Sequence, residues 1–177
     1  MNLARAGEGL THDDFKERLR ESEPARRLIA GLLILQGATE LQIDEPRIAP
    51  TYEERGSYID RGDLYARFIG ETQLHRYEVK RLSVSFSGLE DWPFKGTIFV
   101  DEVDGWERKQ PKPRGYFSVD HEMTAAIWLP CSHPEEWWVK KVYDKHYRTQ
   151  VEFYATNIRR CRAYRLPRAP IERGREL

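Results

Sequence analysis

Long hydrophobic runs and an excess of charge of one sign are both missing from this chain. The longest apolar run, residues 28 to 35, is interrupted by Ala30 and Gly31 and is far too short to span a bilayer. The 29 basic and 29 acidic residues give zero net charge, so no global field draws the chain onto nucleic acid. We therefore expect no membrane contact, and any basic surface must be local.

Cysteine is also scarce, because Cys131 and Cys161 are the only two, and they lack the spacing of a metal site. With no secretory signal segment, the sequence predicts free thiols and a cytoplasmic location. Cys131 and His133 lie close together, but no further ligand follows at a spacing that zinc sites use. The 177 residues, 40% of them hydrophobic and 33% charged, suit one globular domain over residues 1–177.

Two helices are expected before the first strand. Residues 1–10 are small and polar and are predicted to be flexible. Thr11 and Asp14 form a capping-box-like start for the first helix. Pro24 fits the first turn of a second helix, because proline is tolerated there and disrupts a helix interior. Gly37 follows that second helix as a C-cap. Within the helix, apolar residues recur at helical spacing: Ala25, Leu28, Ile29, Leu32 and Leu33.

The stretch from Asp60 to Phe86 predicts two β-strands joined by a turn at Gly70-Glu71-Thr72. Side chains alternate between the two faces of a strand, so Glu78 and Lys80 share one face while Val79 points to the opposite packing layer. If the strands pair, Asp63 at the start of the first strand lies beside Glu78. Two carboxylates and a lysine then converge, which suits a divalent cation that prefers oxygen ligands. Apolar residues supply the strand pattern: Leu64, Ala66, Phe68, Tyr77, Val79, Leu82, Val84 and Phe86.

The remaining segments predict an α/β (α+β) fold. We expect a mixed central sheet with the N-terminal helices on one face and an antiparallel, β-rich C-terminal portion. Residues 104–114, which include the triplet Glu107-Arg108-Lys109, are interpreted as an exposed loop, and residues 159–177 as an arginine-rich tail. Residues 44–57 are interpreted as a long loop. The other expected strands are 38–43, 96–103, 116–119, 124–129, 137–142 and 151–155.

The order of three segments resembles the PD-(D/E)XK nuclease superfamily: SEPARRLIAGLLILQG, DRGDLYARF and YEVKRLSVSF, together about the first half of the chain. The resemblance implies a restriction-endonuclease-like fold in which Asp63 and Glu78 ligate Mg²⁺, with Mn²⁺ as a substitute. It implies that Lys80 orients or activates the attacking water, and that Glu23 is the helix acid completing the metal shell. Many such enzymes are dimers, so a homodimer is possible. Members usually place a helix soon after the Glu-x-Lys strand, whereas residues 87–103 here predict turn and strand.

Elementary chemistry agrees with this resemblance. Cleavage of a phosphodiester needs a nucleophilic water and neutralisation of charge on the phosphate, and a magnesium ion on two carboxylates serves both needs. A neighbouring lysine adds a donor toward the developing charge. The alternative for the same residues is a cross-strand salt bridge, in which Glu78 or Asp63 pairs with Lys80 or Arg81 on a sheet face open to water.

Local basic residues supply the expected contacts to phosphates: Arg26, Arg81, Lys140, Lys141, Arg159 and Arg160. Strand alternation would bury one of Trp137 and Trp138 and expose the other, and an exposed aromatic among cations can stack on unpaired bases. The sequence thus favours a Mg²⁺-dependent DNA nuclease with structure-dependent or weakly sequence-specific cleavage, and RNA is left open as a substrate. The alternative is a non-catalytic nucleic-acid- or protein-binding module of phage or mobile-element origin.

Overall fold

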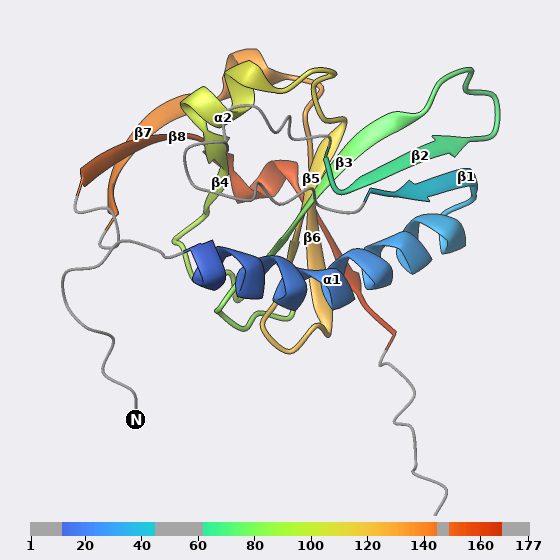
Figure 1. Ribbon diagram of the computed structural model, residues 1–177. Coiled ribbons are helices and arrows are strands. Elements are labelled where there is room, and N and C mark those ends of the chain that lie inside the picture. The colour runs from blue at the N-terminus through green and yellow to red at the C-terminus, as the bar shows by residue number, and fades with distance from the viewer. Residues whose placement is uncertain (1–11, 45–61, 145–148, 168–177) are drawn as a thin grey trace, which may run out of the picture.

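The computed structural model describes residues 12–44, 62–144 and 149–167 (Figure 1). The predictions for residues 1–10, for most of the loop 44–57 and for residues 168–177 of the tail lie outside these ranges. The elements are, in chain order, α1 (His12–Leu35), β1 (Ala38–Ile43), β2 (Leu64–Phe68), β3 (His75–Arg81), β4 (Thr97–Glu102), α2 (Val103–Arg108), β5 (Gly115–Val119), β6 (Ala125–Pro130), η2 (Pro134–Glu136), β7 (Trp138–Asp144), β8 (Thr149–Asn157), η3 (Ile158–Arg160) and β9 (Arg162–Arg165).

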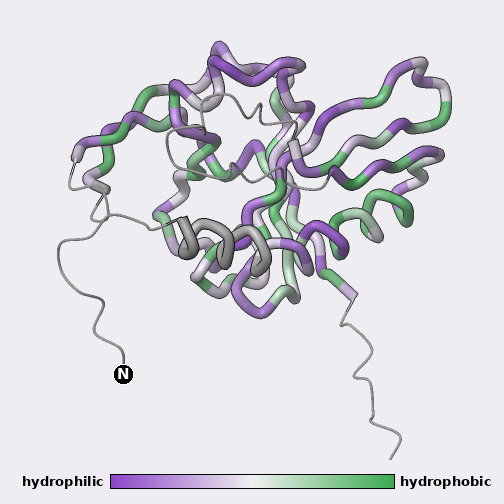
Figure 2. Tube along the Cα trace, viewed as in Figure 1, coloured by the Kyte–Doolittle hydropathy of each residue, from purple (hydrophilic) through white to green (hydrophobic). Residues whose placement is uncertain are grey.

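Helix α1 runs without interruption through Pro24, so the prediction of two helices separated at Pro24 is wrong. A proline inside a helix costs about 3 kcal/mol. Burial of a large apolar side chain stabilises by about 1.5–3 kcal/mol, so the stripe that follows Pro24 can offset this cost. That stripe is buried against the sheet: Ala25, Ile29, Ala30, Leu32 and Leu33. The C-terminal part of α1 is accordingly hydrophobic in Figure 2.

Gly37 ends α1 as predicted, with a φ of 94° that favours glycine. The amide of Gly37 donates to the carbonyl of Ile34, which satisfies one of the last carbonyls of the helix. No helix among the described residues is both long and apolar enough to cross a membrane.

Six strands form the main sheet in the order β1-β2-β3-β5-β6-β9. Neighbouring strands are antiparallel except β3 and β5, which are parallel. Helix α1 lies across one face of this sheet (Figure 1). The expected mixed sheet with N-terminal helical cover on one face is therefore present, and the strand predicted at residues 38–43 matches β1.

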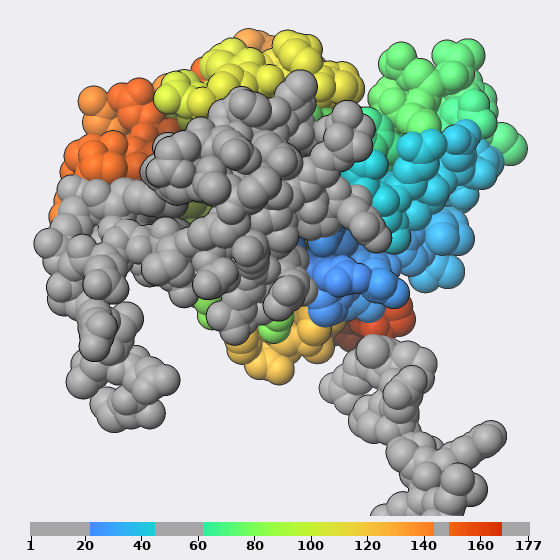
Figure 3. Space-filling view, in the orientation of Figure 1, coloured from blue at the N-terminus to red at the C-terminus, as the bar shows by residue number. Residues whose placement is uncertain are grey.

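A second, antiparallel sheet contains three strands in the order β4-β8-β7. Its apolar side chains pack with those on the second face of the main sheet, and this cluster includes Ile98, Val100, Trp106, Tyr116, Ile127 and Leu129. The antiparallel C-terminal portion is thus divided, because β7 and β8 join β4 while β5, β6 and β9 extend the main sheet. Figure 3 shows α2 and the segment after it (yellow) beside the β7–β8 pair (orange).

Three further boundaries differ from expectation. Strand β3 ends at Arg81, although the apolar pattern continues to Phe86, because Phe86 is buried in the second cluster from a non-strand segment. Residues 104–108, expected within an exposed loop, belong to helix α2, whose Trp106 is buried in the second cluster. In the expected tail, β9 pairs with β6 at the sheet edge, and Leu166 is buried.

Candidate active site

The two faces of β3 carry different side chains. Tyr77 and Val79 are buried in the cluster beneath α1. Arg76, Glu78 and Lys80 occupy the opposite face, toward the second sheet, where their charged groups meet residues of β4 and of the segment after α2. This is the arrangement that strand alternation predicts for Glu78, Val79 and Lys80.

Asp63 lies beside β3 because β2 and β3 pair as predicted, with Leu64 opposite Tyr77. One carboxylate oxygen of Asp63, Oδ2, accepts a hydrogen bond of 2.7 Å from the backbone N–H of Val79. Gly62 has a φ of 87°, and a Cβ there would lie 2.6 Å from Nε of Arg76. Glycine is therefore needed to bring Asp63 close to β3.

Helix α1 presents Arg26 to Asp63. Arg26 is buried, donates to the carbonyl of Asp44 at 3.0 Å and has Nη1 4.0 Å from Oδ1 of Asp63. The sequence predicts that Arg26 contacts phosphates. In the structure its guanidinium is buried and lies within ion-pair range of Asp63. Glu23 forms an ion pair with Arg27 on the exposed side of α1, and it lies mid-helix because α1 begins at His12.

Lys80 is held by β4. Its Nζ donates to the carbonyl of Val100 at 2.6 Å and lies 3.3 Å from Oδ1 of Asp101. The same ammonium is 4.9 Å from the centre of the Tyr116 ring, a distance at which a cation is attracted to the ring face. Lys80 thus links the main sheet to the second sheet.

Glu78 is buried and is paired with two cations. Arg76 donates from Nε to Oε1 of Glu78 at 2.6 Å, and Nζ of Lys109 lies 3.9 Å from Oε2. Lys109 also lies 3.2 Å from Oδ2 of Asp101, so its ammonium stands between the two carboxylates.

Sequence reasoning missed Asp101, Lys109 and Tyr116. Lys109 was assigned to an exposed loop, which is wrong because it follows the last turn of α2 and its side chain is largely buried. Asp101 did carry a signal, since it is an acid that directly follows the apolar residues Ile98, Phe99 and Val100 of β4. The hydroxyl of Tyr116 donates to Oδ2 of Asp101 at 2.7 Å, a contact that no sequence pattern indicates.

Burial and the neighbouring charges shift the pKa of Asp101 in opposite directions. Burial favours the neutral acid, but attraction to Lys80 and Lys109 and the bond from Tyr116 outweigh it, so the pKa of Asp101 lies below its usual value. Burial and the negative charges of Glu78 and Asp101 raise the pKa of Cys131, which carries a free thiol. At neutral pH Asp101 is therefore ionised, and the thiol of Cys131 is neutral.

The donor set fits a hard divalent cation. Asp63 and Glu78 offer carboxylate oxygens, the ligands that Mg²⁺ prefers, and no thiolate competes with them. Nζ of Lys109 lies 3.9 Å from Oε2 of Glu78, within ion-pair range, so a cation bound by Glu78 would compete with this ammonium. Asp63 and Glu78 are therefore residues that could hold such a cation.

The remaining predicted phosphate contacts come from several elements. Arg81 donates to the carbonyl of His121, Lys140 lies 5.4 Å from the centre of the Phe99 ring, and Lys141 pairs with Glu152. Arg159 is exposed, and Arg160 pairs with Glu136. Trp138 is exposed while Trp137 is partly buried in the second cluster, as alternation predicts.

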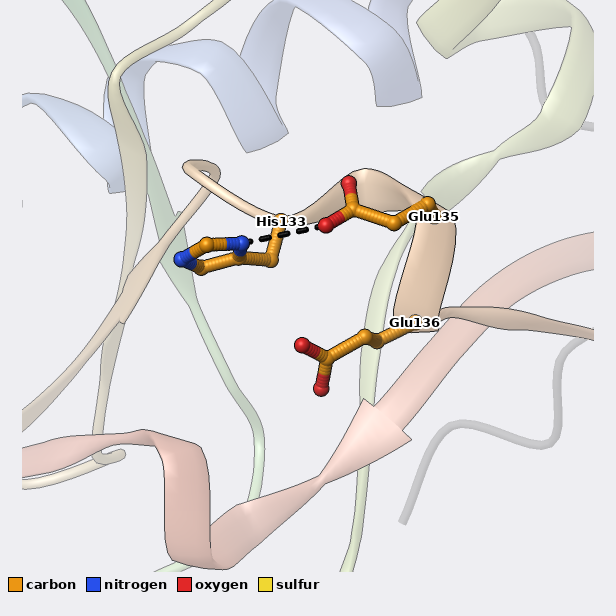
Figure 4. A group of neighbouring side chains, drawn as sticks. All are labelled: His133, Glu135 and Glu136. Carbon is orange, nitrogen blue, oxygen red and sulfur yellow. Dashed lines mark hydrogen bonds and ion pairs between the residues drawn. The ribbon is translucent and has the colours of Figure 1, made fainter.

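His133, Glu135 and Glu136 on and beside η2 form the one group of three potential metal ligands found within the described residues (Figure 4). All three are exposed. His133 already contacts Glu135 at 3.0 Å, and Glu136 pairs with Arg160. The three side chains thus already have polar partners on the surface and need no ion to balance their charges.

A hollow of about 420 Å³ lies between the start of α2 and the β7–β8 pair. Three acids line it, Glu102, Asp104 and Glu152, together with a single lysine, Lys141. This balance of charge is unfavourable for phosphate, so the hollow does not suit the nucleic-acid contacts predicted for Lys141.

Comparisons with protein-family models, curated proteins and solved structures give no significant match to this chain.

Proposed function

We propose that the protein is a Mg²⁺-dependent nuclease that hydrolyses phosphodiester bonds in DNA, with structure-dependent or weakly sequence-specific cleavage. The observation that carries the proposal is the hydrogen bond from Val79 N–H to Asp63. Val79 is the middle residue of Glu78-Val79-Lys80, so this bond ties Asp63, which precedes β2, to the backbone of the Glu-x-Lys segment.

Each residue has a defined part in this proposal. Asp63 and Glu78 would hold Mg²⁺, which supplies charge neutralisation at the phosphate and lowers the pKa of a bound water. Lys80 provides a donor toward the developing negative charge. Arg26 of α1 would support the negative charge of Asp63, from which its Nη1 is 4.0 Å away. Glu23 would join as an auxiliary acid only after leaving Arg27.

The order of the first elements supports the restriction-endonuclease-like part of the proposal. Helix α1 precedes the antiparallel strands β1, β2 and β3. Asp63 directly precedes β2, and the Glu-x-Lys residues stand on β3. The departure noted in the sequence lies after β3, where β4 precedes the six-residue helix α2. That departure places the acid of β4 against Lys80.

The test is cleavage of plasmid, linear duplex, single-stranded and branched DNA, and of RNA, with Mg²⁺, Mn²⁺ or EDTA. Asp63→Asn, Glu78→Gln and Lys80→Met are assayed beside wild type, because each removes one charge with little change of shape. Glu40→Gln is the matched control, since Glu40 is an acid on β1 that pairs with Arg67. We expect metal-dependent cleavage by wild type and Glu40→Gln, and a loss of roughly 100-fold or more in the other three variants.

The preferred substrate in that panel would define the activity. Cleavage that persists in EDTA, or that all three variants retain, would contradict the proposal. Circular dichroism of each variant separates loss of chemistry from loss of fold.

A non-catalytic binding module is the second candidate, because Arg76 and Lys109 already neutralise Glu78 and Asp101 pairs with Lys80. Under this alternative the cluster is a set of ion pairs that joins the two sheets. Nucleic acid would then bind with an affinity that falls with salt, without cleavage, and with no dependence on Asp63.

A further inference from the structure

Strand β4 contains a β-bulge at the point where it meets Lys80. Phe99 pairs with Ala155, and Asp101 pairs with the next residue of β8, Tyr154, so Val100 is the extra residue. In a regular strand Phe99 and Asp101 would share one face. Here Phe99 packs on Phe153, while Asp101 points to the main sheet. Bulges re-aim side chains in this way.

Both groups that hold the Lys80 ammonium come from this bulge. The carbonyl of Val100 accepts from Nζ at 2.6 Å, and Oδ1 of Asp101 lies at 3.3 Å. Val100 is fully buried and fixes the bulge in the second apolar cluster. The second sheet thus provides two hydrogen-bond acceptors for Lys80 of the main sheet.

The Asp101 carboxylate is itself fixed through both oxygens. Oδ1 accepts from the backbone N–H of Glu102 at 3.0 Å. Oδ2 accepts from the Tyr116 hydroxyl at 2.7 Å and lies 3.2 Å from Lys109. The carboxylate cannot rotate away from Lys80 without losing these contacts.

We infer that Asp101 is a positioning residue for Lys80 and that the bulge in β4 makes the second sheet part of the active site. The inference rests on the proposed nuclease function. Lysine has a flexible four-carbon stem, and the Lys80 side chain is about one-third exposed, so the main sheet alone would leave the ammonium mobile. Asp101 and the Val100 carbonyl confine it to one position, against the bulge of β4.

The test compares Asp101→Asn with Glu102→Gln, the neighbouring acid on β4, which is exposed and is the matched control. For Asp101→Asn we expect a kcat lower by roughly 10- to 100-fold, the range found when a supporting residue of a site is removed. KM and the Mg²⁺ affinity measured by calorimetry should stay at wild-type values, because Asp101 is not proposed to touch substrate or metal. Glu102→Gln should match wild type throughout.

Tyr116→Phe provides a second, milder variant, because it removes one donor to Asp101 and keeps the ring. We expect a several-fold loss of kcat. If Asp101→Asn does not fold, Tyr116→Phe alone decides, and an unchanged kcat in that variant overturns the inference.

A readout independent of catalysis is the rate at which Lys80 reacts with an amine-acylating reagent, followed by mass spectrometry. We expect labelling of Lys80 to be several-fold faster in Asp101→Asn than in wild type and Glu102→Gln. If wild type is active but Asp101→Asn shows an unchanged kcat, or an unchanged rate of Lys80 labelling, this inference is overturned and the nuclease proposal stands. Wild type without metal-dependent cleavage overturns the nuclease proposal, and the catalytic part of this inference falls with it. In that case faster labelling in Asp101→Asn would establish only an ion pair between the sheets.

Discussion

The two faces of β3 are both covered by protein, but in different ways. Toward α1, Tyr77 and Val79 pack among apolar side chains. Toward the second sheet, Arg76 and Glu78 are equally buried, yet their contacts are ion pairs and hydrogen bonds. A fold that needed only stability could cover both faces with apolar residues, since buried ion pairs are seldom more stabilising than apolar packing of the same shape.

The difference between the two faces of β3 indicates that a functional site lies on the charged face. The apolar face accounts for the stability of β3, because its residues pack beneath α1. The charged face costs desolvation and gains little stability in return. Lys80 on this face also pairs with Asp101 of β4, and Asp63 is bonded to the backbone of Val79 between Glu78 and Lys80, which is what supports a chemical role for this face.

The largest expected effect on stability comes from removing the buried ion pair on the charged face of β3. Glu78→Leu removes the Nε contact of buried Arg76 and should lower the free energy of unfolding by about 3–5 kcal/mol. Urea denaturation measures this. The double variant Arg76→Met with Glu78→Leu should recover most of the loss, because it buries no unpaired charge. A double variant no more stable than Glu78→Leu would show that the pair does not behave as a buried ion pair.

Ile29→Ala tests the apolar face. Ile29 is fully buried between α1 and the main sheet, so its truncation should cost about 2–5 kcal/mol through lost contacts and a cavity. The loss should be the same at pH 3 and pH 7 in urea denaturation, because no charge changes. Ile34→Ala, at an exposed position of the same helix, is the control and should cost much less.

Asp101→Asn should show a pH dependence that Ile29→Ala lacks. The pKa of Asp101 is lowered in the folded state, so its ionised form contributes stability above the usual carboxyl value of 3.8 and loses it as pH falls toward the folded value. At pH 7 the variant should be less stable by about 1.5–3 kcal/mol, as for a lost hydrogen bond to a charged group. In denaturation at decreasing pH the gap should narrow below pH 3.8. A constant gap would contradict the lowered pKa.

The smallest effect on stability is expected for Lys80→Met. Its side chain is about one-third exposed, so loss of the pair with Asp101 should change the free energy of unfolding by only about 0–1 kcal/mol. The same variant should abolish metal-dependent cleavage under the proposed function. A variant that remains folded and active would remove Lys80 from the proposed chemistry.

Local patterns were enough to predict much of the fold. The alternation in residues 64–68 and 75–81 identified β2 and β3, and it assigned Glu78 and Lys80 to one face and Val79 to the other. Helical spacing from Ala25 to Leu33 identified the face of α1 that covers the sheet. Such patterns are readable because each depends on residues two to four positions apart.

The tertiary structure decided the rest. Whether Pro24 divides a helix depends on the sheet that the following turns pack against, and proline propensity alone gave the wrong answer. The contact between Arg26 and Asp63, the bulge at Val100 and the inward turn of Lys109 each join segments separated by tens of residues. The sequence by itself determined which strand carries the acid and the lysine. Only packing of the second sheet determined which charges surround them, because such contacts follow from the placement of whole elements and leave no local periodicity.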